Sequence, residues 1–253
     1  ESSKIVLLSD CHRGDNSWAD DFALNKNLFH YALYYYNKNG YTYIEVGDGD
    51  ELWENSFHKV WDAHLPIFEL MQKYFDTDPS KNRLHLIYGN HDRKKEDPAY
   101  VKKALQKLFQ NSTECGDSCR QLFENIQFHE GLILNHTKTG KKILVIHGHQ
   151  GDPLCDQFSW LSEFLVRILW KPLQQITGFK DPTSPVNNRS KREKISKNVI
   201  SWLEKNPGAA IIMGHTHEPY IAGFGEAPYY NTGSCVHPRH VTGIEIANDT
   251  ICL

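Results

Sequence analysis

The stretch Leu84-His85-Leu86-Ile87-Tyr88-Gly89-Asn90-His91-Asp92 determines how the rest of this 253-residue chain is interpreted. Its apolar first half predicts a short buried strand, and the Gly-Asn pair predicts a turn directly after it. The turn leaves an amide, an imidazole and a carboxylate side by side at the C-terminal end of the strand. Ligands of α/β proteins bind at that edge of the sheet, so these three polar groups indicate a binding site.

Four more predicted strands, on both sides of this stretch, also end on polar side chains that can bind metal ions. They cover residues 4–8, 41–46, 142–147 and 209–213. Together the five strand ends supply seven donor residues: Asp10, His12, Asp48, Asn90, His147, His215 and His217. A single residue of this kind is usually a turn residue, a helix cap or a structural histidine. Seven nitrogen and oxygen donors with one shareable carboxylate suit two divalent first-row ions better than calcium.

Helices are predicted between these strands, which gives the alternating pattern of an α/β protein. Apolar residues recur at helical spacing in residues 22–36, 56–75 and 97–109, with an interruption at Pro66. Asp97 and Pro98 are the predicted cap and first residue of the last of these helices. Residues 127–135 and 142–147 are predicted to form a hairpin, and the tail to contain a turn at residues 231–234 and a strand at residues 242–247.

Residues 153–198 differ in character and are predicted to form a helical cap, inserted into a single domain that spans residues 1–253. Residues 157–173 are more apolar and aromatic than one core-facing helix stripe requires. A basic run from Arg189 to Lys197 follows. The apolar surface could pack on the core or form a homodimer interface, and the basic run could be a solvated face or attract a phosphorylated substrate.

The composition limits the expected partners and favours one compartment. The formal charge of -3, from 28 Lys and Arg against 31 Asp and Glu, gives no general attraction to nucleic acid or to an anionic membrane. There is no run of 18 apolar residues, so no transmembrane helix is expected. Six cysteines in a chain of this length are weak evidence for disulfides, and Cys115 with Cys119 is the first candidate pair. These features favour a reduced cytoplasmic protein, with peripheral membrane association as an alternative.

The polar strand ends form five motifs in order along nearly the whole chain. They are Asp10-x-His12, Gly47-Asp48-x-x-Glu51, Gly89-Asn90-His91-Asp92, His147 and Gly214-His215-x-His217. In this combination they resemble the motifs of the calcineurin-like metallophosphoesterases. The resemblance implies a two-sheet β-sandwich flanked by helices. It also implies dinuclear metal-dependent hydrolysis of a phosphoester or pyrophosphate bond, by attack of a metal-bridging hydroxide.

The same resemblance implies a role for each motif residue. Asp10, His12 and His217 would hold one metal ion, Asn90, His147 and His215 the other, and Asp48 would bridge them. Manganese is the first candidate for the ions, with iron, zinc and magnesium as alternatives. His91 would lie near the leaving-group oxygen and donate a proton or stabilise charge there. The predicted catalytic residues are therefore His91, Asp48 and Glu51.

Two positions depart from the common pattern of the family. Many members carry an aspartate where this chain has Glu51, whose longer side chain could still orient His91. Asp50 competes for that role, unless it is a solvated loop acid. Asp92 is expected to fix the turn by hydrogen bonding, and His149 to contact the substrate or the metal ligands, with an extra metal ligand as the alternative.

The segment Glu51-Leu52-Trp53 and the insertion between His147 and His215 also resemble, in part, the branch of UDP-2,3-diacylglucosamine hydrolases. In that branch the cap shelters acyl chains, but an arginine commonly replaces His91 and an aspartate replaces His149. A lipid pyrophosphatase is therefore one alternative to a general phosphoesterase. A non-catalytic protein-binding scaffold is another, because some members of this fold lose their metal ligands. The expected partners are a small phosphorylated substrate, nucleotide- or lipid-linked, and a second copy of the chain through the cap.

Overall fold

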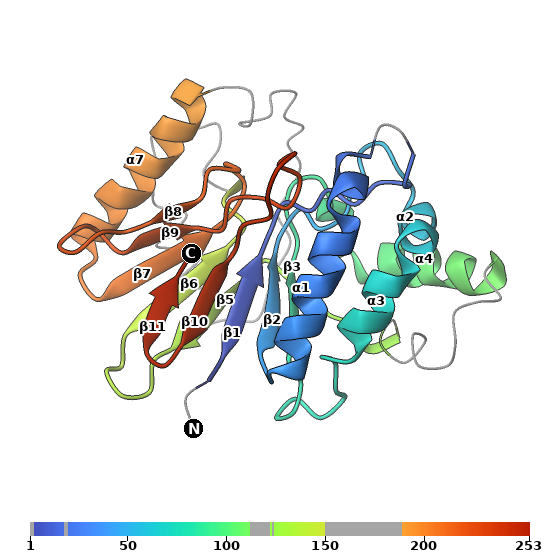
Figure 1. Ribbon diagram of the computed structural model, residues 1–253, viewed down its shortest axis with the longest axis horizontal. Helices are drawn as coiled ribbons and strands as arrows, with labels where there is room; N and C mark the ends of the chain where they lie inside the picture. Colours follow the sequence, from blue (N-terminus) through green and yellow to red (C-terminus); the bar gives the residue numbers. More distant parts are fainter. Residues whose placement is uncertain (1–2, 18–19, 112–121, 123, 150–188) are drawn as a thin grey trace.

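The computed structural model describes residues 3–17, 20–111, 122, 124–149 and 189–253. These residues form two mixed sheets flanked by helices (Figure 1). The first sheet contains, from edge to edge, β11 (Thr250–Cys252), β10 (Ile244–Ala247), β1 (Ile5–Leu8), β2 (Thr42–Val46), β3 (Leu84–Ile87) and β4 (Phe128–His129). The second contains β5 (Gly131–Asn135), β6 (Lys142–Ile146), β7 (Ala209–Met213), β9 (Tyr229–Asn231) and β8 (Tyr220–Ile221).

Parallel pairing brings the C-terminal ends of the central strands to one edge of each sheet. β1, β2 and β3 are parallel neighbours, with Leu8 opposite Glu45 and Val46 opposite Ile87. In the second sheet β6, β7 and β9 are also parallel, with Ile146 opposite Met213. The loops that follow these strands therefore start from the same edge of their sheet, and these loops carry the predicted donor residues.

Aliphatic side chains from both sheets form a shared core. Leu7, Ile44, Val46 and Ile87 come from the first sheet, and Val145 and Ile212 from the second. Burying one such side chain contributes about 1.5–3 kcal/mol, so this layer holds the sheets together and fixes the loops at their edges. The two-sheet β-sandwich predicted from the motifs is confirmed.

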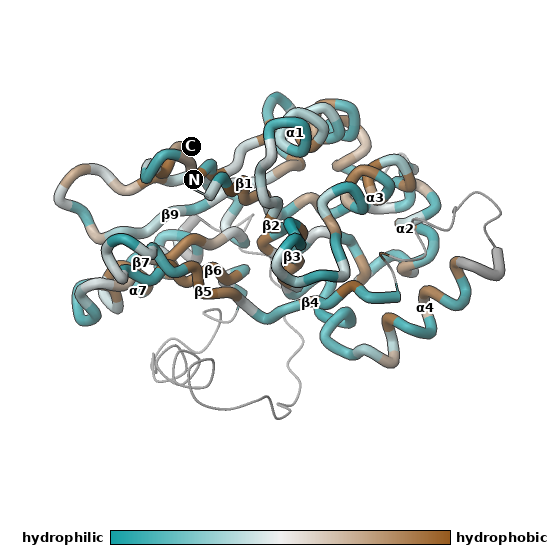
Figure 2. Tube along the Cα trace, turned by 90° about the horizontal axis from the view of Figure 1, so that it is seen from below, coloured by the Kyte–Doolittle hydropathy of each residue, from teal (hydrophilic) through white to brown (hydrophobic). Residues whose placement is uncertain are grey.

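Five helices of the described residues cover the outer faces of the sheets. α1 (Lys26–Lys38), α2 (Phe57–Ala63), α3 (Leu65–Gln72) and α4 (Pro98–Asn111) share an apolar core with the first sheet, and α7 (Arg189–Lys205) shares one with the second. Apolar and polar residues alternate along α4 (Figure 2), because one face of this helix is buried. As predicted, the helix is interrupted near Pro66, which lies in the first turn of α3, and Pro98 begins α4.

Residues 127–135 form two strands, so the prediction of one continuous strand is wrong. β4 pairs with β3 in the first sheet, whereas β5 pairs with β6 in the second. The chain bends at Glu130 and passes from one sheet to the other. The predicted hairpin is confirmed for β5 and β6, with Asn135 opposite Lys142.

The first helix begins later than the predicted residue 22. The Asp20 carboxylate accepts a hydrogen bond from the Phe22 N–H and caps a short 3₁₀ helix at Asp21–Leu24, which ends at Asn25. The Asn25 side chain donates to the carbonyl oxygens of Cys235 and His237, which ties this junction to the C-terminal tail. Leu24, which lies inside the predicted helix, is 78% exposed in this junction.

Several predictions fall on residues outside the described ranges. Cys115, Cys119 and residues 153–188 of the predicted cap are among them. From Arg189 onward, α7 continues without interruption through Asn198 to Lys205, and its buried Val199 and Trp202 pack with the second sheet. Among the helices that the structure describes, none has the length and apolar character needed to cross a membrane.

Candidate metal centre

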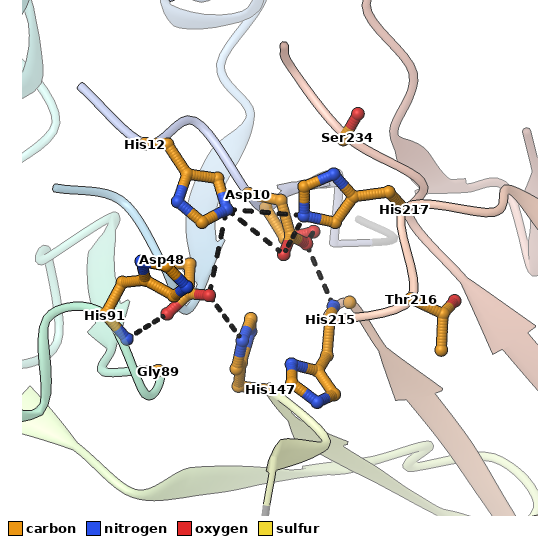
Figure 3. A network of polar contacts seen from close by, with 12 residues as sticks. Asp10, His12, Asp48, Gly89, His91, His147, His215, Thr216, His217 and Ser234 are labelled. Atoms are coloured by element: carbon orange, nitrogen blue, oxygen red, sulfur yellow. Dashed lines mark hydrogen bonds and ion pairs between the residues drawn. The ribbon is translucent and has the colours of Figure 1, made fainter. Parts of the chain in front are cut away.

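The loops after β1, β2, β6 and β7 bring six of the predicted donor residues together (Figure 3), and the loop after β3 carries the seventh, Asn90. Three overlapping groups of side chains have donor atoms within 4.8 Å of one another. They are Asp10, His12 and His217; His12, Asp48 and His91; and Asp48, His147 and His215. Residues separated by more than 200 positions in the sequence thus converge on one small volume.

Asp48 lies between two histidine pairs, which are His12 with His217 and His147 with His215. Its Oδ2 is 3.1 Å from His147 Nε2 and 3.8 Å from His12 Nε2. On the far side, His217 Nε2 lies 3.0 Å from Asp10 Oδ1 and 3.3 Å from His12 Nε2. A carboxylate in this central place can contact two cations, one beside each histidine pair.

Hydrogen bonds fix the orientation of two of the imidazoles. His147 Nδ1–H donates to the carbonyl oxygen of Val46 at 2.9 Å, and His12 Nδ1–H donates to Glu51 Oε2 at 3.1 Å. Because these acceptors have no proton to donate, Nδ1 carries the proton in each ring. The Nε2 atom then points away from the acceptor and remains available to bind a metal ion. Metal-binding histidines are held in this way by an outer carboxylate or carbonyl group.

Some buried polar atoms of the site make no hydrogen bond, which is the feature that a bound cation would explain. Asn90 Oδ1 is one of them, and Asp10 Oδ1 and His147 Nε2 also lack hydrogen-bond geometry, although they lie close to His217 and Asp48. By contrast, Asp10 Oδ2 accepts hydrogen bonds from the Ser9 hydroxyl and from the His215 N–H. Burial without a hydrogen bond costs free energy, and these atoms are of the types that coordinate divalent first-row ions. The side chains present therefore fit the metal centre that the sequence predicts.

The backbone at these residues adopts a rarely occupied conformation. Five of the eight described non-glycine residues with positive φ are predicted ligands: Asp10, His12, Asp48, His215 and His217, with φ between 46° and 67°. The other three are Asn16, Asn248 and Asp249, and Asn, Asp and His are the non-glycine types found most often in this region. Strain of about 1–3 kcal/mol per residue persists where a site requires it. Its concentration here indicates that the loops are shaped for function.

The glycines of the motifs leave room for the donor side chains. A Cβ atom on Gly89 would lie 2.1 Å from Asp48 Oδ1, and one on Gly214 would lie 2.5 Å from Asp10 Oδ2. Both distances are shorter than any van der Waals contact, so a side chain at either position would displace a carboxylate of the site. These two glycines are required by close approach.

The charges of the site shift the pKa values of its members. Burial raises the pKa of Asp10, but His217 and His147 outweigh this effect and lower it to about 2. Burial lowers the pKa of His12, but its hydrogen bond to Glu51 and the charges of Asp48 and Asp10 raise it to about 9. The pKa of His147 is also raised to about 9, since Asp48 and Asp10 outweigh burial. Protons on histidines thus balance the carboxylates, and cations can take their place.

Glu51, rather than Asp50, contacts His91. Glu51 Oε2 accepts a hydrogen bond from His91 Nδ1–H at 2.6 Å, in addition to the one from His12. Asp50 is fully buried and pairs with Arg13 Nε at 2.7 Å and with Lys95 Nζ at 2.8 Å. Both predicted roles of Asp50, orienting His91 or lying in solvent, are therefore wrong, because the buried side chains of Arg13 and Lys95 bind its carboxylate.

Asp92 and His149 occupy the edges of the site. Asp92 accepts hydrogen bonds from Gly89 N–H at 2.7 Å and from Gly49 N–H at 3.1 Å, so it fixes the turn as predicted. The ring of His149 lies 5.5 Å from that of His147, and burial together with the charges of His147 and His215 lowers its pKa. His149 belongs to none of the three donor groups found among the described residues.

A second group of buried charged side chains was not predicted from the sequence. We call it the arginine cluster: Arg13, Glu45, Asp50, Asp92 and Lys95. Arg13 contacts both oxygens of Glu45, at 2.7 and 2.8 Å, and Lys95 lies 2.6 Å from Asp92 Oδ2. One sequence signal was available, because Glu45 is a charged residue inside an apolar strand and must find a partner when buried.

The family of the chain follows from a sequence match that covers most of its length. Residues 3–219 match the family model Metallophos, described as calcineurin-like phosphoesterase. The chain therefore belongs to the calcineurin-like phosphoesterase family. No curated protein matches the chain.

The chain is similar, at low sequence identity, to several solved structures. A novel archaeal phosphodiesterase is 14% identical, with a TM-score of 0.45 and coverage of 98% of this chain and 97% of its own. A dimetal phosphatase from Danio rerio is 12% identical, with a TM-score of 0.45 and coverage of 96% and 91%. Vps29 from Entamoeba histolytica in complex with Zn²⁺ is 13% identical, with a TM-score of 0.39 and coverage of 98% and 87%.

Proposed function

We propose that this protein is a dinuclear metal-dependent hydrolase of a phosphoester or pyrophosphate bond. One observation supports this function most strongly: six of the seven predicted donor residues converge in one place, and buried donor atoms of the site, Asn90 Oδ1 among them, make no hydrogen bond. Asp10, His12 and His217 would hold one ion, and Asn90, His147 and His215 the other. Asp48 would contact both ions.

The residues around the donors have separate tasks. When bound, two divalent ions lower the pKa of a water molecule and neutralise charge on phosphate oxygens. Glu51 keeps the His12 and His91 rings in place through its Oε2. The protein thereby presents the Nε2 atom of His91, opposite the anchored Nδ1, to the leaving-group oxygen. From there it can donate a proton or stabilise the developing negative charge.

The test combines metal analysis with hydrolysis assays. The purified protein is stripped with a chelator, reloaded separately with Mn²⁺, Fe²⁺, Zn²⁺ or Mg²⁺, and assayed with a chromogenic phosphomonoester, a phosphodiester and a nucleotide diphosphate. We expect about two ions per chain and turnover that depends on them. Absence of both bound transition metal and metal-stimulated turnover would instead favour the protein-binding scaffold. Preference for a lipid-linked diphosphate over the other substrates would identify the lipid pyrophosphatase alternative.

A further inference from the structure

Trp53 is an exposed aromatic residue in contact with the candidate metal centre. It is 48% exposed, although a tryptophan of a globular protein is usually well buried. Its indole stacks on the imidazole of His91, with ring centroids 3.7 Å apart and an angle of 20° between the planes. Its Nε1–H donates a hydrogen bond to the carbonyl oxygen of Asn90 at 2.9 Å. One side chain therefore contacts two neighbouring residues of the Gly-Asn-His-Asp motif.

The turn that carries Trp53 is itself anchored to the site. The Trp53 N–H donates to Glu51 Oε1 at 3.2 Å, while the other oxygen of the same carboxylate binds His91. The preceding residue, Leu52, is fully buried, and its carbonyl oxygen accepts a hydrogen bond from Lys94 Nζ at 2.7 Å. The indole is thus presented by a fixed turn, which explains how an exposed side chain can hold a defined position.

The His91 ring needs such support because its hydrogen bond alone does not fix its plane. Glu51 anchors Nδ1, but the imidazole could still rotate about the direction of that bond. His12 contacts the ring at 4.6 Å in a T-shaped arrangement with an interplanar angle of 87°, and Trp53 stacks on it nearly in parallel. Together these two contacts determine the ring plane and hence the direction of Nε2.

We infer that Trp53 is a positioning residue that holds the His91 imidazole toward the leaving-group oxygen and keeps the Asn90 backbone in place. The inference rests on the proposed function. It assigns Trp53 no contact with the reacting atoms, so its effect must pass through His91. That requirement separates positioning from a merely structural role, because only positioning depends on the leaving group.

The test compares Trp53→Leu, Trp53→Phe and wild type as metal-loaded full-length enzymes, on phosphodiesters with a p-nitrophenol or an alkyl alcohol leaving group. An alkyl alcohol needs help from His91 to depart, whereas p-nitrophenolate needs little. We expect Trp53→Leu to lose about 10–100-fold in kcat on the alkyl ester, as for other outer supporting residues, and about threefold or less on the aryl ester. Trp53→Phe keeps the stacking and should recover most of the loss.

A double-mutant cycle completes the test. If Trp53 acts through His91, Trp53→Leu should cause no further loss on the alkyl ester in a His91→Ala background. The matched control is Tyr34→Leu on α1, since Tyr34 is also 48% exposed; this variant should behave as wild type. Equal losses on both esters, additive losses in the cycle, or a Trp53→Phe variant as impaired as His91→Ala would overturn the inference. A wild type without metal-dependent hydrolysis would overturn the proposed function as well.

Discussion

Two buried groups of charged side chains lie next to each other and are neutralised in different ways. The candidate metal centre contains the carboxylates of Asp10 and Asp48 with histidines around them, and some of its buried atoms make no hydrogen bond. In the arginine cluster, the carboxylates of Glu45, Asp50 and Asp92 are paired with Arg13 and Lys95 at 2.6 to 2.8 Å. The two groups meet at Asp92, which accepts a hydrogen bond from Gly49 N–H next to Asp48.

The two groups differ in whether their positively charged side chains can lose a proton. An arginine cannot lose its proton in a protein, and the pKa of Lys95 is raised above its usual range because Asp50 and Asp92 outweigh burial. Histidines can release their protons, so the charge at the candidate metal centre is exchangeable for that of metal ions. The arginine cluster therefore serves as a permanent support under the loop of residues 47–51, while the neighbouring site remains able to accept ions.

The largest expected effect separates the function of the two groups. Asp48→Ala removes the one carboxylate that lies between both histidine pairs, so we expect loss of bound metal and a fall in kcat/KM of about ten-thousandfold, as for members of a catalytic unit. Metal content and turnover are measured on the same preparation. Because His147 can release its proton when Asp48 is lost, the metal-free variant should remain folded. Retention of both metals with substantial activity would refute the assignment of Asp48.

The arginine cluster should respond to the loss of a member by unfolding instead. Arg13→Met leaves Glu45 and Asp50 buried beside too little positive charge, and we expect the free energy of unfolding to fall by about 3–5 kcal/mol. Denaturant unfolding of the metal-free protein measures this loss, with Asp48→Ala as the comparison. Arg13→Lys, which keeps the charge but not the paired contact with Glu45, should lie between Arg13→Met and wild type. An Arg13→Met loss no larger than that of Asp48→Ala would remove the distinction.

The sequence predicts the members of the candidate metal centre better than those of the arginine cluster. The donors of the candidate metal centre each follow a short apolar strand, and parallel strands end at one edge of a sheet, so local patterns predict that the donors lie together. Glu45 could be recognised as an unusual charge in a strand, but its partner Arg13 lies 32 positions away and is set by tertiary packing. The split of residues 127–135 between two sheets had the same cause, because alternation of residues does not tell which neighbouring strand will accept them.

A substitution of His91 tests whether this residue is a ligand of the candidate metal centre. Its backbone N–H donates to Asp48 Oδ1 at 2.9 Å, but its imidazole is anchored by Glu51 on the outer side. We expect His91→Ala to keep both ions and to lose about a hundredfold in kcat on an ester with a poor leaving group. Metal analysis beside the kinetic assay distinguishes this result from that of Asp48→Ala. Loss of one ion from His91→Ala would make His91 a ligand and extend the centre by one residue.

The smallest expected effect is the pH dependence of the arginine cluster. Burial raises the pKa of Asp50, but Arg13 and Lys95 outweigh it and hold the pKa well below its usual value of 3.8. Asp50 therefore stabilises the folded state above about pH 4, and this stabilisation decreases as the pH falls below that value. One proton limits the slope to about 1.4 kcal/mol per pH unit.

Denaturant unfolding of metal-free wild type and Asp50→Asn between pH 5 and pH 3 measures this slope, since the substitution removes the titrating group. Wild type should lose stability more steeply than the variant as the pH falls. The slopes are compared rather than the absolute stabilities, because Asp50→Asn also weakens the contacts with Arg13 and Lys95. Equal slopes would mean that the pKa of Asp50 is the same in the folded and unfolded chain. In that case the arginine cluster would not stabilise the ionised form of this carboxylate more than water does.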